Sequence, residues 1–329
     1  MKLGNTTSNT KRLVFNSIAI YLKSILSVIL LLYTSRVIFR SLGVSDFGIY
    51  NLLGGTIALC GFLNASISVS TQRFLSFEMG RKNWGAVHQV FNTSVVIHAS
   101  IALLVIVIAE TIGSFLVRHL DIPIARHNAA FWSFQALIVN VAASMVMGPF
   151  QALMNAHEDM YILSGFEIGD VLLRVGAALV LPFLNYDRLI AYAILLVLIS
   201  LLDFLVIFVI CKMRYKLSGI GTMVDRNVLF KLLGFSGWNV LAALAMLGKN
   251  QGLAIILNMF HGVLINAAYA IANQVSGQLM TFSQSVVRAT NPQITKSFSA
   301  GNMEEMFALT FRCSKVAFGP FHNVCPFAL

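Results

Sequence analysis

Charged residues are scarce in this sequence of 329 residues: 11% are Asp, Glu, Lys or Arg, whereas 57% are hydrophobic. A soluble domain usually carries about 25% charged residues. The mean hydropathy is +0.79. We therefore expect hydrocarbon, not water, to cover most of the chain. Because backbone polar groups in hydrocarbon must be satisfied inside helices, the composition predicts an all-α integral membrane protein.

Catalytic and metal-binding motifs are also absent from the sequence. It contains no G-x-x-x-x-G-K-[ST], no H-E-x-x-H and no G-x-S-x-G, and Gly219-Ile220-Gly221 lacks the third glycine of a dinucleotide site. The four cysteines, Cys60, Cys211, Cys313 and Cys325, lie far apart, without the spacing of a metal site or a disulfide framework. We therefore expect no enzyme, no metal and no cofactor.

Acidic residues are outnumbered by basic ones, 13 against 23, which gives a net charge of +10. In a soluble protein this excess would suggest a nucleic-acid partner. Here the basic residues gather in short polar loops, where the positive-inside rule and anionic headgroups account for them. We expect membrane lipids, and no nucleic acid, as partners.

Long apolar stretches recur along the chain, and a transmembrane helix needs about 20 such residues. A ninth stretch begins near Met306, where we expect Gly319-Pro320 to interrupt the helix before it crosses. About eight complete spans are predicted, at Leu13–Tyr33, Phe47–Ser70, Val90–Val117, Ala129–Met154, Leu163–Leu184, Leu189–Cys211, Leu229–Met259 and Val263–Val287.

Basic loop residues are divided unequally between the two sides of the membrane. This asymmetry places the N-terminus and the loop Lys212–Lys231 in the cytoplasm of a multi-pass protein. The inner side would hold Lys2, Lys11, Arg12, Arg73, Arg81, Lys82, Lys212, Arg214, Lys216, Arg226, Lys231, Arg288 and Lys296, and the outer side only Arg36, Arg40, Arg118, Arg126 and Arg188.

A weak internal repeat relates the two ends of the chain. Similar residues recur at an offset of 219 or 220, a parallel repeat of the kind that transporters use. We expect residues 1–216 to form a complete six-helix lobe and residues 217–329 a partial second lobe with spans seven, eight and a broken ninth. Two full units would need about 440 residues, so we expect a C-terminally truncated, inactive form. The matched positions are Phe15-Asn16 with Phe235-Ser236, Tyr50 with Tyr269, Phe91 with Phe311, and Gly80–Asn83 with Ala300–Met303.

Polar residues recur on one face of several predicted spans. Serine, threonine and glycine members of these stripes are explained by helix packing. A lysine in a span is costly, and the stripes of Lys23 and Lys249 contain no acid, so we expect both to line a water-filled cationic cavity for an anionic passenger. The candidate cavity residues are Lys249, Arg288, Lys23, Asn250, Gln251, Asn273, Gln284 and Arg174.

Acidic residues inside the spans are few. Asp170 and Arg174 lie four apart and are expected to pair along one helix, one turn after Glu167. Glu110 and Asp203 are lone acids, for which proton relay and hydrogen-bonded packing both stay open.

Two segments carry a resemblance to a known family. Phe235–Ser299 and Arg36–Gly55, which reads RVIFRSLGVSDFGIYNLLGG, resemble polysaccharide flippases of the MATE-like multidrug/oligosaccharidyl-lipid/polysaccharide exporter superfamily, especially forms common in the Bacteroidetes. The tail Phe318–Leu329 resembles nothing in that family.

The resemblance implies two six-helix bundles that face each other across a V-shaped cavity. It implies a lipopolysaccharide O-antigen or capsule repeat unit on undecaprenyl pyrophosphate, moved across the bacterial cytoplasmic membrane by alternating access, with saccharide polymerase and export components as partners. Lys249 and Arg288 match family positions that engage the pyrophosphate.

Three other functions stay open. A MATE-type multidrug or cation antiporter would need a buried acid in the cavity. A membrane-embedded glycosyltransferase or polymerase would need acids or histidines that converge at a membrane face, for which only His157-Glu158-Asp159 qualifies. A purely structural membrane subunit is the third.

Overall fold

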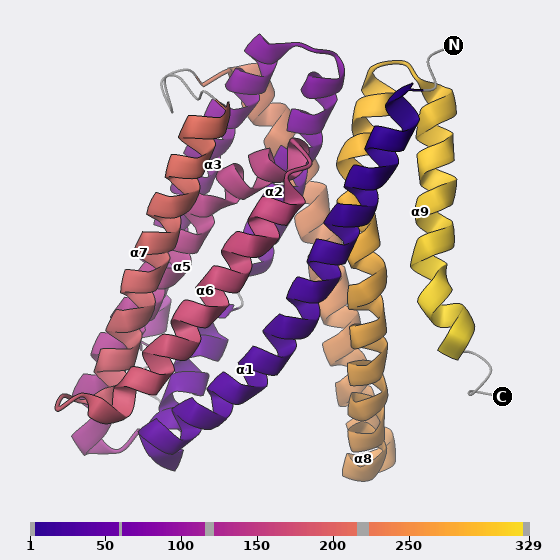
Figure 1. Cartoon of the computed structure of the whole chain (residues 1–329). Helices are drawn as coiled ribbons and strands as arrows, with labels where there is room; N and C mark the ends of the chain where they lie inside the picture. Colours follow the sequence, from indigo (N-terminus) through magenta and orange to yellow (C-terminus); the bar gives the residue numbers. More distant parts are fainter. Residues whose placement is uncertain (1–3, 59–60, 116–121, 216–223, 325–329) are drawn as a thin grey trace.

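The computed structural model describes residues 4–58, 61–115, 122–215 and 224–324, and within these ranges it consists of helices joined by short turns, without a strand. The all-α prediction is therefore confirmed. Short π and 3-10 segments at Ala109–Gly113, Ile124–Arg126 and Leu181–Phe183 adjoin the longer helices. Those helices are α1 (Gly4–Ala58), α2 (Gly61–Gly80), α3 (Trp84–Ile108), α5 (His127–Ala156), α6 (Met160–Val180), α7 (Arg188–Tyr215), α8 (Arg226–Ser299) and α9 (Met303–Val324), shown in Figure 1.

Helix α1 turns sharply at Gly43, where φ is 78° and ψ is 174°. This left-handed region is open to glycine at little cost, because glycine has no Cβ. The chain descends to the kink and then climbs again through the end of α1 and through α2 (Figure 1). The first predicted span and the described part of the second are therefore helical, and a kink at Gly43 joins them instead of a loop. Residues 59 and 60 of the second span lie outside the described residues.

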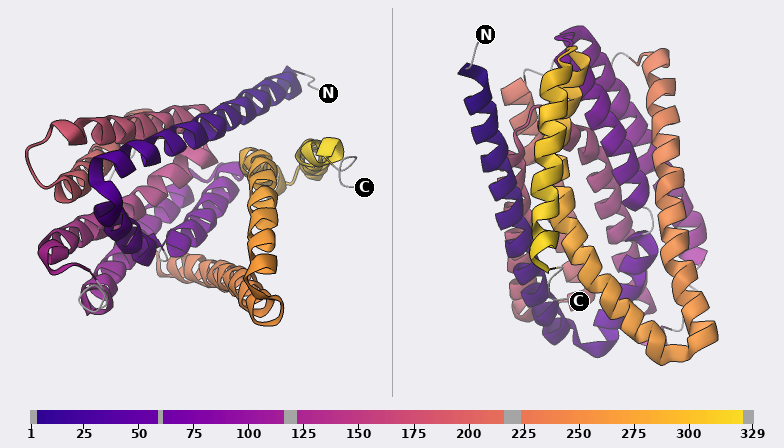
Figure 2. Two further views of the ribbon diagram at one scale, coloured as in Figure 1. Left: turned by 90° about the horizontal axis from the view of Figure 1, so that it is seen from below. Right: turned by 90° about the vertical axis from the view of Figure 1, so that its right-hand side faces the viewer.

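Helix α8 contains both the seventh and the eighth predicted span. Its ribbon descends, bends back at the lower end of the molecule and returns, as the right-hand view of Figure 2 shows. Helix α9 then runs from Met303 to Val324. The predicted interruption at Gly319-Pro320 is wrong, because the helix continues through both residues. Residues 325–329 of the unusual tail lie outside the described residues.

Four helical stretches of the described chain are long and apolar enough to cross a membrane. They coincide with the third, fourth, sixth and seventh predicted spans. The remaining predicted spans are largely helical in their described residues. The four stretches that qualify are Trp84–Thr111, Ile124–Ala156, Arg188–Tyr215 and Arg226–Met246.

The largest buried cluster lies among α2, α3, α5 and α7. Phe150 is 2% exposed and packs edge-on against Phe91 and Phe204, at centroid distances of 5.4 and 5.9 Å. Phe208 contacts the same ring at 5.9 Å. Aromatic edges packed in this way fix the helices to one another.

The internal repeat appears in the structure as two copies of one turn, which lie near the N-terminus at the upper end in Figure 1. Asn83 N–H donates to the carbonyl of Glu78, and Asn302 N–H to that of Ser297. Each asparagine side chain then caps the next helix by accepting from the backbone N–H three residues on. Equivalent residues of the two turns are 219 positions apart in every case. The residue equivalent to Gly80 is therefore Ser299, one position before the Ala300 expected from the sequence.

The turns share a backbone conformation as well. Lys82 has φ 57° and Gly301 has φ 77°, again 219 apart. We call the end of the molecule where these two turns lie the turn end. The division into lobes at residues 216 and 217 stays a prediction.

Candidate functional site

A cavity of about 590 Å³ lies between α1, α2 and α8 and is the candidate functional site. Three cations, amides, hydroxyl groups and one aromatic ring line it, and the described lining residues include no carboxylate. The residues that matter for the argument are Lys23, Gln72, Arg73, Phe235, Gln284, Arg288 and Asn291.

Arg73 and Phe235 form one wall of the cavity. The Arg73 guanidinium carbon lies 4.3 Å from the centre of the Phe235 ring, a cation–π contact. Phe74 meets the same ring edge-on at 6.2 Å. The aromatic pair thus positions the guanidinium. The sequence analysis counted Arg73 among the basic residues of the inner side and did not expect it to line a cavity.

Lys23 lines the cavity as predicted, but it has a partner that was not expected. Its ammonium lies 2.8 Å from the Glu167 carboxylate of α6, and both side chains are mostly buried. The expectation of an unpaired lysine is therefore wrong, since an acid from another helix balances it. Arg73 and Arg288 supply the remaining positive charge of the lining.

The other predicted cavity residues are distributed over the molecule. Gln284 and Arg288 line the cavity, as predicted. Lys249 and Asn273 are exposed on α8 and are not among its lining residues. The side chains of Asn250 and Gln251 lie outside the described residues.

Arg174 belongs to a separate polar cluster inside the helix bundle. Its Nε donates to Asp170 Oδ1 at 2.6 Å, which confirms the predicted pair along α6. Asp203 of α7 is buried and lies beside Asp170. Asp203 is thus no lone acid, and Arg174 lies outside the cavity lining.

The second predicted lone acid, Glu110, also has polar neighbours. Gln135 Nε2 donates to its carboxylate at 3.1 Å, and Ser114 lies 3.5 Å away. These contacts support the packing interpretation of Glu110.

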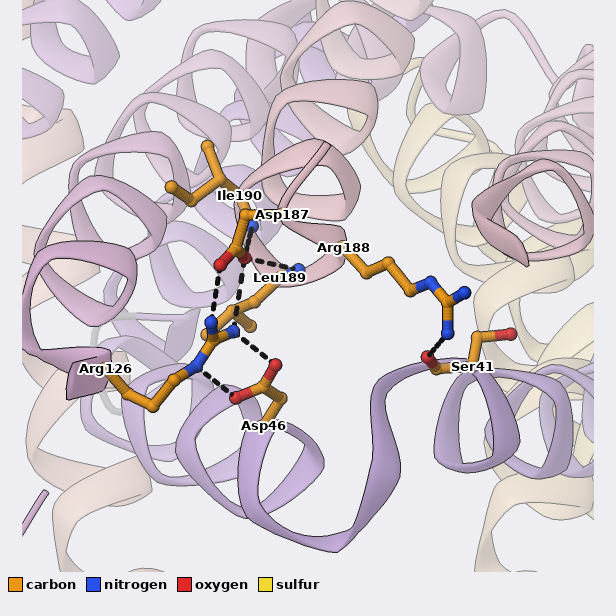
Figure 3. A network of polar contacts seen from close by, with 7 residues as sticks. All are labelled: Ser41, Asp46, Arg126, Asp187, Arg188, Leu189 and Ile190. Atoms are coloured by element: carbon orange, nitrogen blue, oxygen red, sulfur yellow. Dashed lines mark hydrogen bonds and ion pairs between the residues drawn. The ribbon is translucent and has the colours of Figure 1, made fainter. Parts of the chain in front are cut away.

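Opposite the turn end, an ion-pair network ties three segments together (Figure 3). The Arg126 guanidinium is hydrogen-bonded to Asp46 after the α1 kink and, at 2.5 Å, to Asp187 before α7. Arg188 Nη1 donates to the Ser41 carbonyl at 3.0 Å. Two of the five arginines counted as outer loop charges therefore hold the fold together, which spacing alone did not reveal.

Asp187 also caps α7, accepting from the backbone N–H groups of Leu189 and Ile190. Partial burial by itself raises the pKa of the Asp187 carboxyl. The hydrogen bonds from Arg126 and from the two backbone groups outweigh this effect and hold the pKa below its ordinary value.

At the turn end, His157, Glu158 and Asp159 connect α5 to α6. Asp159 accepts from Arg214 Nε at 2.8 Å and from the Tyr215 hydroxyl at 2.8 Å. His157 stacks on Tyr215 at a centroid distance of 4.1 Å. Burial of the His157 imidazole lowers its pKa, and the positive charges of Lys296 and Arg214 lower the pKa further. The hydrogen bond to the Leu153 carbonyl and the negative charge of Asp159 raise the pKa, but they do not outweigh the other effects.

Glu158 points to α8 instead of α7. Its carboxylate lies 2.6 Å from the Lys296 ammonium and accepts from Gln293 Nε2 at 2.9 Å. His157, Glu158 and Asp159, the candidate residues for a glycosyltransferase site, thus make contacts between helices.

Comparison with known proteins identifies the fold. No family model and no curated protein matches the sequence. Among solved structures, an outward-facing multidrug resistance transporter of the MATE family has a TM-score of 0.81 at 14% identity, over 96% of this chain and 71% of its own. A MATE transporter from Vibrio cholerae has a TM-score of 0.75 at 14% identity, over 94% and 70%.

A third structure is a MOP superfamily transporter from Pyrococcus furiosus, whose binding pocket is described as having a reverse polarity that suggests a different function. Its TM-score is 0.78 at 13% identity, over 94% of this chain and 69% of its own. The chain therefore has the MATE-like fold of the MOP superfamily transporters. The predicted fold class is confirmed, and the apolar helices make it a multi-pass membrane protein.

Proposed function

We propose that this chain, which has the fold of membrane transporters, moves a lipid-pyrophosphate-linked oligosaccharide across the bacterial cytoplasmic membrane. The observation that supports this most directly is the charge of the cavity. Arg73 and Arg288 line it together with Lys23, and no described lining residue is acidic. Coulomb attraction in a site of reduced dielectric favours an anionic passenger.

The chemistry of the lining suits a pyrophosphate attached to a sugar. A guanidinium presents a planar set of donors that matches phosphate oxygens, and such charge-assisted hydrogen bonds are strong. Gln72, Gln284 and Asn291 add amides that can donate to and accept from sugar hydroxyl groups. An O-antigen or capsule repeat unit on an undecaprenyl-type carrier fits this description, with polymerase and export components as partners.

A MATE-type multidrug or cation antiporter is the second candidate, because one of the similar structures is a multidrug resistance transporter of the MATE family. One feature favours it: Asp170 and Asp203 lie side by side inside the helix bundle, and acids in membrane spans are typical of ion-coupled transporters. Neither residue lines the cavity, so this pair supports ion coupling more directly than it supports a cationic passenger.

Arg288→Ala tests the proposed passenger. The probe is a fluorescent undecaprenyl-pyrophosphate oligosaccharide, titrated into the purified full chain in nanodiscs. Loss of one charged hydrogen-bond donor should weaken binding about tenfold to a hundredfold, with partial recovery in Arg288→Lys. Arg312→Ala is the matched control, because Arg312 is exposed on α9 and does not line the cavity.

Competition by a lipophilic cation distinguishes the two candidates. Suppose that the unlabelled cation displaces its labelled form from the protein, whereas the lipid-linked saccharide neither binds nor competes. The flippase proposal is then wrong, and the antiporter is favoured. Unchanged saccharide affinity in Arg288→Ala would show that this arginine does not engage the passenger.

A further inference from the structure

The α5–α6 turn directs two neighbouring carboxylates to different parts of the fold. Asp159 pairs with Arg214 of α7, whereas Glu158 pairs with Lys296 of α8. Residue 158 has φ 64°, a left-handed conformation that is uncommon for a residue with a side chain. Hydrogen bonds from the N–H groups of 157, 158 and 159 to carbonyls of α5 maintain it. The backbone thus holds Glu158 toward α8.

The Glu158 contact is largely removed from water. The Glu158 side chain is 11% exposed and that of Lys296 25%. Gln293, which is 6% exposed, donates to the second carboxylate oxygen. An ion pair with both oxygens engaged is costly to break on one side only, because the remaining charge stays buried.

A second contact joins α2 and α8 at the same level. At Gly80 an added Cβ would overlap the Ser299 hydroxyl and the backbone of Lys296, so the two helices lie too close there for a side chain at residue 80. Gly80 and Ser299 are also equivalent positions of the repeat. The two copies of the turn therefore meet at one point, directly beside the Glu158 ion pair.

These contacts lie where the cavity ends. On α2 the lining includes Gln72 and Ser76, and on α8 it includes Asn291 and Thr295. One residue beyond Thr295, Lys296 pairs with Glu158, and one turn beyond Ser76, Gly80 rests on α8. The described lining on α2 and α8 thus ends next to the contacts just described.

We propose that Glu158 is a latch: its ion pair with Lys296 holds the turn end of the cavity closed, and its release opens the cavity to the side of the membrane on which the turns lie. This inference rests on the proposed transport function, since it assigns one step of alternating access to named residues. It joins residues from the two predicted lobes and requires no change within either.

Thiol accessibility of the cavity tests the latch. A single reporter cysteine, Gln72→Cys, is placed in a background without the four native cysteines, and the full chain is labelled with an impermeant maleimide from either side of the membrane. Glu158→Gln and Lys296→Met should each raise the labelling rate from the turn side about tenfold or more. The charge-reversed pair Glu158→Lys with Lys296→Glu should return the rate toward that of the parent.

Asp159→Asn is the matched control, because it breaks a neighbouring ion pair that joins the same turn to α7 and not to α8. It should lower thermal stability without raising turn-side labelling. A cysteine at Tyr186, which is exposed at the opposite end, reports the sidedness of each preparation.

Equal labelling in the parent, Glu158→Gln and Lys296→Met would overturn the latch, as would an equal rise in Asp159→Asn. The readout needs no substrate, so the two proposals can fail separately. Saccharide binding with unchanged labelling would leave the transport function standing without the latch. Raised labelling without saccharide binding would leave the latch without the proposed passenger.

Discussion

At the scale of single residues, the contacts of Asp187 make the fold sensitive to acid. The ordinary pKa of an aspartate is 3.8, and that of Asp187 in the folded protein is lower. The unfolded carboxyl therefore takes up its proton first as pH falls. The stability contributed by Asp187 is complete above pH 3.8 and is lost progressively below it.

Asp187→Asn measures this contribution. At pH 7 we expect a loss of about 1 to 2 kcal/mol, a moderate value because the pair is partly exposed. Thermal melts in one detergent should show the difference between wild type and variant shrinking below pH 3.8. A constant difference down to pH 3 would show that the charge of Asp187 does not stabilise the fold.

Sequence reasoning identified several site residues individually but not the contacts between them. Arg288 and Gln284 were recognisable because they interrupt an apolar helix at helical spacing. The Lys23 partner could not be found in the same way, since Glu167 lies 144 positions away and meets it only after α1 packs on α6. Arg73 was not expected in the cavity because a basic residue near a helix end ordinarily indicates a cytoplasmic loop.

At the scale of elements, two glycines of α1 allow the effect of backbone conformation on stability to be measured apart from the effect of packing. Both have open space where a Cβ would go, but Gly43 has φ 78° and Gly48 lies in regular helix. Gly43→Ala should destabilise the protein by about 1 to 2 kcal/mol through backbone strain alone. Gly48→Ala should be neutral or stabilising by up to about 1 kcal/mol.

Denaturation of the two variants in parallel checks this expectation. Equal stabilities would mean that the kink adopts another conformation in the membrane. The kink itself was not expected from sequence, where the apolar pattern marks a span on each side but does not distinguish a loop from a sharply bent helix.

At the scale of the whole molecule, the orientation in the membrane follows from the loop charges. We expect the N-terminus and the turn end to face the cytoplasm. A cysteine at Lys82 should then react with an impermeant reagent only in inside-out vesicles, and a cysteine at Tyr186 only in intact cells. The reverse result would invert the topology and, with it, the direction to which the latch opens the cavity.

The point where Gly80 meets Ser299 also has a mechanical consequence. A helix limb of about 30 residues is about 45 Å long, so a rotation of about 5° around a contact at one tip moves the other tip by about 4 Å. The returning limb of α8 ends at this contact, and it can rotate about the contact as a rigid body. Opening the cavity at the end opposite the turns would then need little local rearrangement. Opening it at the turn end requires Gly80 and Ser299 to separate.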